Sequence, residues 1–299
     1  MQSLIFTREQ LLGWLQTDVD AIAWCRQQAI IPSTATCPLC QAPMIEKKHH
    51  CMDNAIWSCS RTINGVRHYQ KVSLRHGSIF ADTQLPVKTI VRILYEWSRR
   101  TERHEAAFQL ELNKDTVGAW YKRFRKISGE ILARTQNDRI SGAEKIIEID
   151  ECQLARRKHN HGRVPREQWV FGGVVRRSNP IECFIELVPS RSRGVLCEVI
   201  QRRISPEVRI ISDGWAAYAN LTLLGFRHDV VNHSHNYVSA TDPTVHTQNV
   251  ENLWRCVRRF LAKNGTNTRR NLQGYINKFI FRKLNNDAFE SIIHGMWHH

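Results

Sequence analysis

Lys145-Ile-Ile-Glu-Ile-Asp150 and Val208-Arg-Ile-Ile-Ser-Asp213-Gly-Trp215 are the two stretches that decide the fold of this 299-residue chain. Each is an apolar run of strand character that ends in an aspartate, and the second continues with a glycine that permits a sharp turn. Because side chains alternate along a strand, Glu148 and Asp150 lie on one face of the first run. If the two strands are neighbours, Asp150 and Asp213 face one crevice at the edge of the sheet.

Further strands and helices surround these two runs between residues 143 and 299. The spacing of apolar residues predicts strands at 168–176 and 182–188, and helices at 193–203 and 250–263. Three strands therefore precede the first helix, and a strand and more helices follow it. This order is typical of an RNase H-like α/β fold, which we expect for residues 143–299.

A third acidic residue, Glu251, lies in the stretch His246-Thr-Gln-Asn-Val-Glu251-Asn-Leu-Trp-Arg255. Asn249 or Thr247 can cap a helix here, which places Glu251 in the first helical turn. Arg258 lies two turns later and shares the face of Glu251. We therefore predict that Glu251 joins the two aspartates in an acidic triad.

Phosphodiester transfer with hard cations is the chemistry that suits such a triad. Mg²⁺ or Mn²⁺ takes oxygen ligands from a few carboxylates and keeps positions for water and phosphate oxygens. Two ions about 3.5 to 4 Å apart would activate the attacking water or 3′-hydroxyl and stabilise the leaving oxygen. Glu148 is an alternative ligand on the face of Asp150. Glu151 is expected either to support the ligands from behind or to face solvent.

The charge of the chain predicts a polyanionic partner. Lys and Arg total 43 against 28 acidic residues, a net charge of +15 with an isoelectric point near 9.7. Nine Lys or Arg residues and no acid lie between Asn252 and Lys283. We expect this region to face phosphates, and a solvated basic helix is the alternative. Its candidate DNA contacts are Arg255, Arg258 and Arg259.

Residues 83–140 show the spacing of three helices, with Pro86 at the start of the first and 102–110 as the second. Asn113 can cap a third helix, whose apolar residues recur at helical intervals. Helix, short helix, turn and basic helix form the pattern of a helix-turn-helix DNA-binding domain, although any three-helix bundle has similar spacing. The basic residues that we place on the outer side of the third helix, as candidate DNA contacts, include Lys114, Lys122 and Arg123.

Cysteine and histidine cluster between residues 31 and 82. Zinc takes four N or S ligands in a tetrahedron, and the two-residue gap between Cys37 and Cys40 lets one turn present both thiolates to one ion. A single such pair can also be coincidental or redox-active. The candidate ligands of a zinc ribbon are Cys37, Cys40, Cys59 and, as the fourth, His68 or Cys51. His68 fits paired hairpins better, whereas Cys51 would make all four ligands thiolates.

The N-terminal residues 1–30 are predicted to contain an amphipathic helix at 7–30 and carry no obvious chemistry. They lack the uninterrupted apolar core of a secretory signal, and no apolar stretch of the chain approaches the roughly 20 residues that a membrane-spanning helix requires. The nine cysteines are an odd number, which suits a reducing compartment. We therefore expect an intracellular protein that has no membrane partner.

Five segments between residues 145 and 265 stand in a characteristic order, namely IEIDECQLARRKHNHGR, QWVFGGVVRR, IISDGWAAY, VNHS and HTQNVENLWRCVRR. The Cys-rich stretch that ends in Val72–Phe80 and the helix TVGAWYKRFR precede them. Together these motifs resemble the transposases of the Merlin superfamily of DNA transposons and their bacterial insertion-sequence relatives. The chain departs from the family pattern where a further Cys would follow the Trp-x-Cys pair, and His68 can replace that Cys.

This resemblance implies a DDE-type cut-and-paste transposase that binds terminal inverted repeats and cleaves and joins DNA strands. Its catalytic triad would be Asp150, Asp213 and Glu251, and its cysteine-rich region would be a zinc ribbon. The resemblance further implies that Trp215, His233 and His246 lie near the site, although hydrogen bonding beneath a loop is an alternative role for the histidines.

The partners implied are double-stranded DNA, as element ends and as target, and a second copy of the chain, because two ends must be brought together. The compartment would be the nucleus in a eukaryote, which we favour, or the cytoplasm in a bacterium. Two other functions remain open. One is a domesticated transposase that binds DNA as a regulator without catalysis, and the other is an RNase H-like nuclease of repair or RNA processing.

Overall fold

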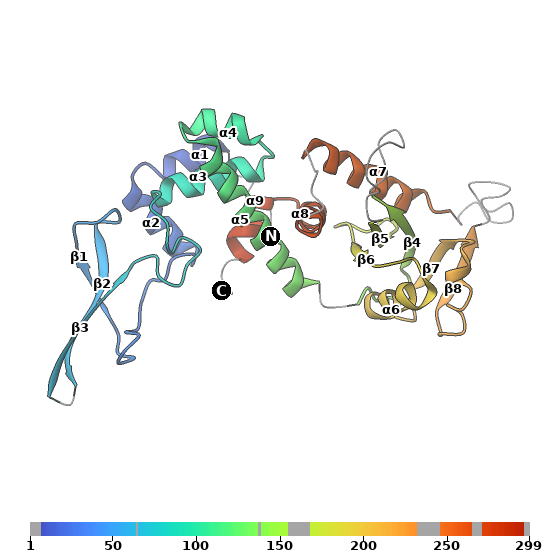
Figure 1. Ribbon diagram of the computed structural model, residues 1–299, viewed down its shortest axis with the longest axis horizontal. Helices are drawn as coiled ribbons and strands as arrows, with labels where there is room; N and C mark the ends of the chain where they lie inside the picture. Colours follow the sequence, from blue (N-terminus) through green and yellow to red (C-terminus); the bar gives the residue numbers. More distant parts are fainter. Residues whose placement is uncertain are drawn as a thin grey trace. The chain divides into compact units, whose positions relative to one another are not determined.

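A computed structural model of the chain describes residues 7–63, 65–136, 139–154, 168–231, 246–264 and 271–295. It divides into two compact units, Met1–Ile131 with Asp287–His299 and Leu132–Asn286, both drawn in Figure 1. Each unit combines helices with one β-sheet, so the described part of the chain is a mixed α/β structure. Within the described ranges, no helix is long and apolar enough to cross a lipid bilayer.

The first unit contains a three-stranded antiparallel sheet and six helices among the residues described. In chain order these are α1 (Arg8–Trp14), α2 (Asp18–Gln27), β1 (Ile45–Lys48), β2 (Ala55–Ile63), β3 (Val66–Ser73), α3 (Val87–Ser98), α4 (Arg103–Leu110), α5 (Lys114–Thr135), which continues into the second unit, and α9 (Ala288–Gly295).

The predicted N-terminal helix is in fact two helices. Thr17 lies between them and caps α2, since its hydroxyl accepts from the backbone N–H of Asp20, whose carboxylate accepts from the N–H of Thr17 in return. This reciprocal capping box starts a new helix at Asp18, and Leu15 ends the preceding one. The prediction of one helix over 7–30 was therefore wrong, because the apolar spacing of the two helices runs on across the cap.

Helices α3, α4 and α5 follow the spacing predicted from the sequence. Glu111 ends α4 in the left-handed conformation with φ 55°, and the Asn113 side chain accepts from the N–H of Asp115 at 2.8 Å to start α5. Val117 and Phe124 of α5 are buried, as their helical spacing predicts. The turn between the two helices thus has three residues.

The second unit is built on a five-stranded sheet of order β6-β5-β4-β7-β8. Its elements are β4 (Ile146–Gln153), β5 (Trp169–Val175), β6 (Cys183–Val188), α6 (Arg193–Arg203), β7 (Arg209–Asp213), the short 3₁₀-helix η1 (Ala216–Tyr218), β8 (Arg227–Val231), α7 (Gln248–Lys263) and α8 (Leu272–Leu284). β5 runs antiparallel to β4 and β6, whereas β7 is parallel to both β4 and β8. β8 had not been predicted, because its sequence begins with three polar residues.

The two faces of this sheet carry different helices. Ile147, Ile149 and Phe171 point to the side on which α6 packs with Leu196 and Ile200. The opposite side of β4 and β5 packs against α7. The alternation along β4 therefore sends its isoleucines into the core and its acids toward α7.

The division into units differs from the four domains expected from the sequence. The boundary falls inside α5, and the last described helix, α9, belongs to the first unit and not with 143–286. Phe289 of α9 packs on Trp24 and Tyr95, with ring centroids 6.2 Å and 5.8 Å away. From the sequence, the C-terminal segment was expected in the domain 143–299. Apolar spacing shows that a helix has a buried face, but it does not show which core covers that face.

We expect Gly172→Ala to destabilise the second unit by about 1 to 3 kcal/mol. A Cβ at Gly172 would lie 2.6 Å from the backbone oxygen of Phe184 and 2.9 Å from the Trp254 ring. Urea unfolding measures the loss. Gly194→Ala in α6 is the matched control, since a Cβ there meets nothing within 4 Å; an equal loss in both variants would contradict the packing constraint at Gly172.

Candidate active site and metal centre

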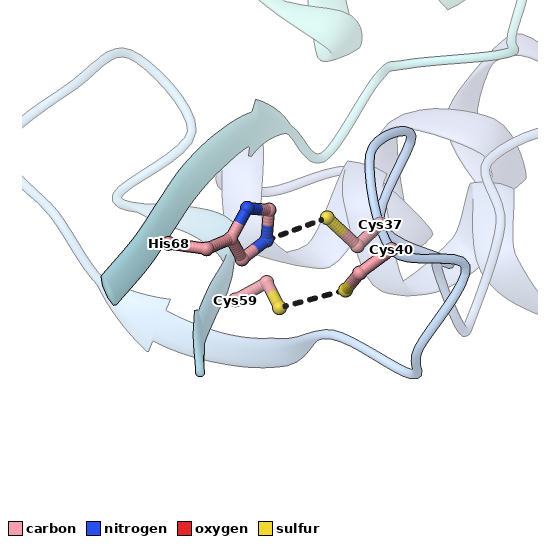
Figure 2. A group of neighbouring side chains, drawn as sticks. All are labelled: Cys37, Cys40, Cys59 and His68. Carbon is pink, nitrogen blue, oxygen red and sulfur yellow. Dashed lines mark hydrogen bonds between the residues drawn. The ribbon is translucent and has the colours of Figure 1, made fainter. Parts of the chain in front are cut away.

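Four metal-ligating side chains of the first unit converge on one point. The ligand atoms of Cys37, Cys40, Cys59 and His68 all lie within 4.8 Å of one another. Figure 2 shows the two cysteines of the loop facing Cys59 and His68, which come from β2 and β3. The backbone N–H of Gln41 donates to the carbonyl of Cys37 at 2.8 Å, closing the turn that presents the first two thiols together.

This set can hold one metal ion. In tetrahedral zinc thiolates the Zn–S bond of about 2.3 Å places two sulfurs about 3.8 Å apart, and the sulfurs of Cys40 and Cys59 are 3.7 Å apart. The sulfur of Cys37 lies 3.2 Å from Nε2 of His68. Cys51 lies outside the set, and its thiol donates to the carbonyl of Ala55 at 3.5 Å.

The thiols of this set differ in acidity. Although desolvation opposes ionisation of Cys37, hydrogen bonds from the backbone of Cys40 and Leu39 outweigh it and lower the pKa of Cys37 to about 6. Desolvation and the neighbouring sulfurs raise the pKa of Cys59 to about 11. One thiolate is therefore available at neutral pH, and a bound cation would release the remaining protons.

The two strand-end aspartates lie at the same edge of the five-stranded sheet. β4 and β7 are parallel, with Glu148 opposite Ile211, so Asp150 and Asp213 continue the same register two residues later. Their charges interact, since Asp213 contributes to a raised pKa of Asp150. The shared crevice expected from the sequence stays a prediction, since Asp213 is not among the residues that line the pocket of Asp150.

Asp150 is poised to exchange a proton near neutral pH. Desolvation, followed by the charges of Glu151 and Asp213, raises the pKa of Asp150 to about 7, against weaker opposition from hydrogen bonds. Those bonds come from the Trp254 indole at 2.9 Å and from the backbone N–H of Glu151 at 2.8 Å. The ionised form of this aspartate therefore needs a nearby positive charge.

Glu251 lies in the first turn of α7 and shares a pocket of about 380 Å³ with Asp150. The Thr247 hydroxyl donates to Oε1 of Glu251 at 3.3 Å. The ligand atoms of the first unit all lie within 4.8 Å of one another. Among the described residues, the carboxylate oxygens of Asp150, Asp213 and Glu251 do not form so close a group. The other residues that line the pocket are Glu151, Cys152, Trp254, Arg255 and Arg258.

Glu148 does not compete with Asp150 for an external ligand, because its oxygens are fully used. The side chain has no exposed surface and accepts from the Arg176 guanidinium at 2.6 Å. It also accepts from the backbone N–H of Asn249 at 2.7 Å, from its side-chain amide at 2.6 Å, and from the N–H of Val250 at 3.1 Å. Glu148 thus caps α7 from a neighbouring strand.

Thr247, one of the two predicted caps, does stand at the start of α7, but Glu148 provides the side-chain cap. Thr247 occupies the capping position, but its side chain makes no capping hydrogen bond to the backbone. The signal available in the sequence was a glutamate on an apolar strand, on the face of Asp150, and we had weighed it as a metal ligand. Only the tertiary structure shows that the first turn of α7 lies against it.

Glu151 and Trp215 belong to a second group beside the aspartates. The Tyr218 hydroxyl donates to Glu151 at 2.5 Å, and the Arg191 guanidinium lies 3.7 Å from the other carboxylate oxygen. The same guanidinium stacks on Trp215, 4.1 Å from the ring centroid. The Trp215 backbone N–H donates to Oδ1 of Asp213 at 3.1 Å. The sequence assigns no role to Arg191 or to Tyr218, although Tyr218 ends the motif IISDGWAAY.

The predicted histidines and basic residues occupy different places. The carbonyl of His246 accepts from Arg176 at 2.5 Å, so this histidine lies at the start of α7 rather than in the pocket; His233 lies outside the described residues. Arg258 lines the pocket and donates to the Cys152 sulfur at 3.0 Å. The other candidate DNA contacts, all exposed, are Arg255 and Arg259 on α7 and Lys114, Lys122 and Arg123 on α5.

We expect Glu148→Gln to destabilise the second unit by about 3 to 5 kcal/mol, because the amide removes the negative charge that faces the partly buried Arg176 and turns its own N–H groups toward other donors. Glu182→Gln is the control, since Glu182 pairs with Lys145 at a partly exposed site and such pairs are worth about 1 kcal/mol or less. Denaturant unfolding compares the two, and a small loss in both would contradict the capping role.

We expect a divalent cation to raise the melting temperature more at pH 8 than at pH 6. The folded pKa of Asp150 is raised from 3.8 to about 7, so its contribution to stability is full at low pH and is lost as the pH rises through about 7. A cation that binds the ionised form restores that loss only above this pH. Thermal unfolding of the wild type, Asp150→Asn and Asp229→Asn, with and without Mg²⁺, measures it. A shift in Asp150→Asn as large as in the other two would refute the role of Asp150.

The comparisons with known proteins concern the second unit. Residues 138–283 match a family model described as the ISXO2-like transposase domain, whereas no curated protein gives a significant match to the chain. The matched segment holds the whole five-stranded sheet, both strand-end aspartates and Glu251. This match indicates that residues 138–283 are similar to the transposase domains of insertion sequences.

Proposed function

We propose that the chain is a DDE transposase that cleaves DNA and transfers its strands with the help of divalent cations. The observation that carries this proposal is the pairing of Asp150 with Asp213 at one sheet edge, with Glu251 in the pocket of Asp150, inside the transposase-like segment. The three carboxylates would hold two Mg²⁺ or Mn²⁺ ions. These ions would activate water or a 3′-hydroxyl and stabilise the leaving oxygen.

The remaining residues of the pocket would act on the DNA and on the ligands. Arg255 and Arg258 bring positive charge to the wall of the pocket, where a phosphodiester backbone would pass. The Trp254 indole bonds Asp150, and Glu148 sets the start of the helix that carries Glu251. These side chains would keep the carboxylates in place as a cation enters and leaves.

The folds of both units support this proposal. The sheet has the order β6-β5-β4-β7-β8, in which β5 is antiparallel to its two neighbours and β7 is parallel to its two neighbours, and we propose that it belongs to an RNase H-like fold. The turn between α4 and α5 and the exposed cations of α5 suit a helix-turn-helix that lies on duplex DNA.

The finer identity of the protein is also part of the proposal. The order of the five motifs favours a relation to the Merlin superfamily, with recognition of terminal inverted repeats and cut-and-paste transposition of the element. Because two ends react together, we propose that the chain acts on DNA as a homodimer or a larger oligomer.

We assign zinc to the four-ligand group, so we expect about one zinc per chain in purified protein. Cys59→Ser and His68→Ala should lose the metal and unfold the three-stranded sheet, because a structural ion contributes folding energy directly. Cys51→Ser is the matched control and should retain it. Metal analysis and circular dichroism measure both effects. If Cys51→Ser loses zinc and His68→Ala retains it, the fourth ligand is Cys51 and not His68.

The catalytic proposal is tested by plasmid nicking and strand transfer with Mg²⁺ or Mn²⁺. Asp213→Asn should lower the rate by roughly 100-fold or more while leaving DNA binding intact, since it removes a ligand of the ions. Asp229→Asn changes a carboxylate of the next strand, bound to Arg209, and should keep activity.

Two outcomes would replace this function. If wild type and Asp213→Asn bind DNA equally and neither cuts, even when supplied with candidate ends, the chain is a DNA-binding regulator. If RNA–DNA hybrids are cut in preference to DNA, it is an RNase H-like nuclease.

A further inference from the structure

The hairpin of β2 and β3 has two faces of different composition. Cys59 lies opposite Gln70 and His68 opposite Arg61, so the two metal-ligating residues share one face, the metal face. The other face, the outer face, alternates with it along each strand. Its exposed residues are Ile45 and Lys47 on β1, Ser60 and Thr62 on β2, and Arg67, Tyr69, Lys71 and Ser73 on β3.

The outer face is basic and carries no acid. Along β3 the outer residues are exposed, whereas the metal-face residues from His68 to Val72 are partly buried. The sole carboxylate in the three strands, Glu46, lies on the metal face and is paired with Arg26 at 3.0 Å. Cations that meet no acid on their own face of a sheet are suited to a polyanion.

The cations and the aromatic ring of this face form one row. The Lys71 ammonium lies 5.5 Å from the centre of the Tyr69 ring, and Arg67 follows two residues nearer the tip. Arg67 and Lys71 are about 13 Å apart along the strand, so each can reach a different phosphate of one DNA strand. Tyr69, which is 56% exposed, lies between them.

The shape of the hairpin fits a DNA groove. In Figure 1, β2 and β3 extend together as a long two-stranded ribbon away from α1, α2 and α3. A ribbon of this kind enters the major groove of B-DNA, which is about 12 Å wide. The strands of one hairpin are about 4.8 Å apart, which leaves room for side chains on both sides.

The base of the ribbon is less suitable for DNA than its tip. A hollow of about 730 Å³ there is lined by Lys71 and Ser73 together with Asp53 and Asp82. Asp53 is neutralised by Arg75 at 2.5 Å, but Asp82 is exposed. The favourable surface therefore runs from Tyr69 toward the turn, and Lys71 lies at its border with this hollow.

We propose that the outer face of the β2–β3 ribbon is a contact surface for duplex DNA, with Arg67 and Lys71 on phosphates and Tyr69 against the groove. This inference rests on the proposed function for the identity of the partner. It adds to that function a surface separate from the three carboxylates and from α5 and α7, and it leaves the metal face to hold the ribbon together.

The test is the binding of the full-length chain to a short DNA duplex across a range of salt, with no divalent cation and no chelator added. Each phosphate contact contributes about 0.9 to the slope of log K against log salt. The double variant Arg67→Ala/Lys71→Ala should therefore lower the slope by about 2 and weaken binding by on the order of 50-fold at 0.1 M salt.

The matched control is Lys48→Ala/Arg61→Ala, which removes two exposed cations from the metal face of the same sheet, on β1 and β2. It should bind nearly as the wild type does, and both double variants should keep zinc, which excludes unfolding. Equal losses in the two double variants, or no loss in Arg67→Ala/Lys71→Ala, would overturn the proposal. So would equally tight binding to an RNA duplex, whose deep and narrow major groove does not admit a ribbon.

This test is independent of strand cleavage. A chain that never cuts DNA but binds it through Arg67 and Lys71 supports the inference while refuting the proposed catalysis. A chain that cuts DNA and binds it equally well without these two cations refutes the inference alone.

Discussion

The second unit depends on the buried Glu148 carboxylate, which joins the sheet to α7. The group has no exposed surface, and it accepts hydrogen bonds from Arg176, Asn249 and Val250. An ionised carboxylate in such a place is tolerated only because every oxygen is satisfied and the guanidinium balances its charge. The dipole of α7 adds further stabilisation at the helix N-terminus. Glu251 follows within one turn, so this contact, together with the packing of α7 on β4 and β5, sets its position relative to the sheet.

A balance of charges surrounds the aspartates beside that contact. Asp150 is partly buried next to Asp213 and Glu151, which raises its pKa to about 7. Arg191 offsets part of this negative charge, since it lies beside Glu151 and stacks on Trp215. Arg258 lines the other side of the pocket. Acidic side chains therefore lie at the centre of the site, and the arginines lie at its edges. This distribution of charge is expected where cations bind and a phosphate backbone approaches.

The three-stranded sheet of the first unit is organised by a different interaction. Its small apolar cluster consists mainly of Cys37, Met44, Trp57, Cys59 and Leu74, and so few residues give limited stability by burial alone. Ligands from the loop, β2 and β3 meet at the side of this cluster, so one bound ion would link all three segments. On the metal face Cys59 and His68 are committed to this ion, whereas Arg67 and Lys71 of the outer face are exposed.

The sequence by itself determined helices α3 to α7 and strands β4 to β7 with their order, because the periodicity of apolar residues is a local property. Alternation along Lys145–Asp150 placed Asp150 opposite the core, and the Cys37–Cys40 spacing marked a metal site. Only the tertiary structure decided between Glu148 and Asp150, since both share one face and the difference lies in the α7 backbone about 100 residues later. The same holds for His68 against Cys51, because the pairing register of β2 and β3 brings one of them to the sulfurs, and for α9, whose apolar residues complete the first unit. In each case two residues or two positions in the fold fit the local sequence pattern equally well. A contact between segments far apart in the sequence decides between them, and local spacing does not reveal such a contact.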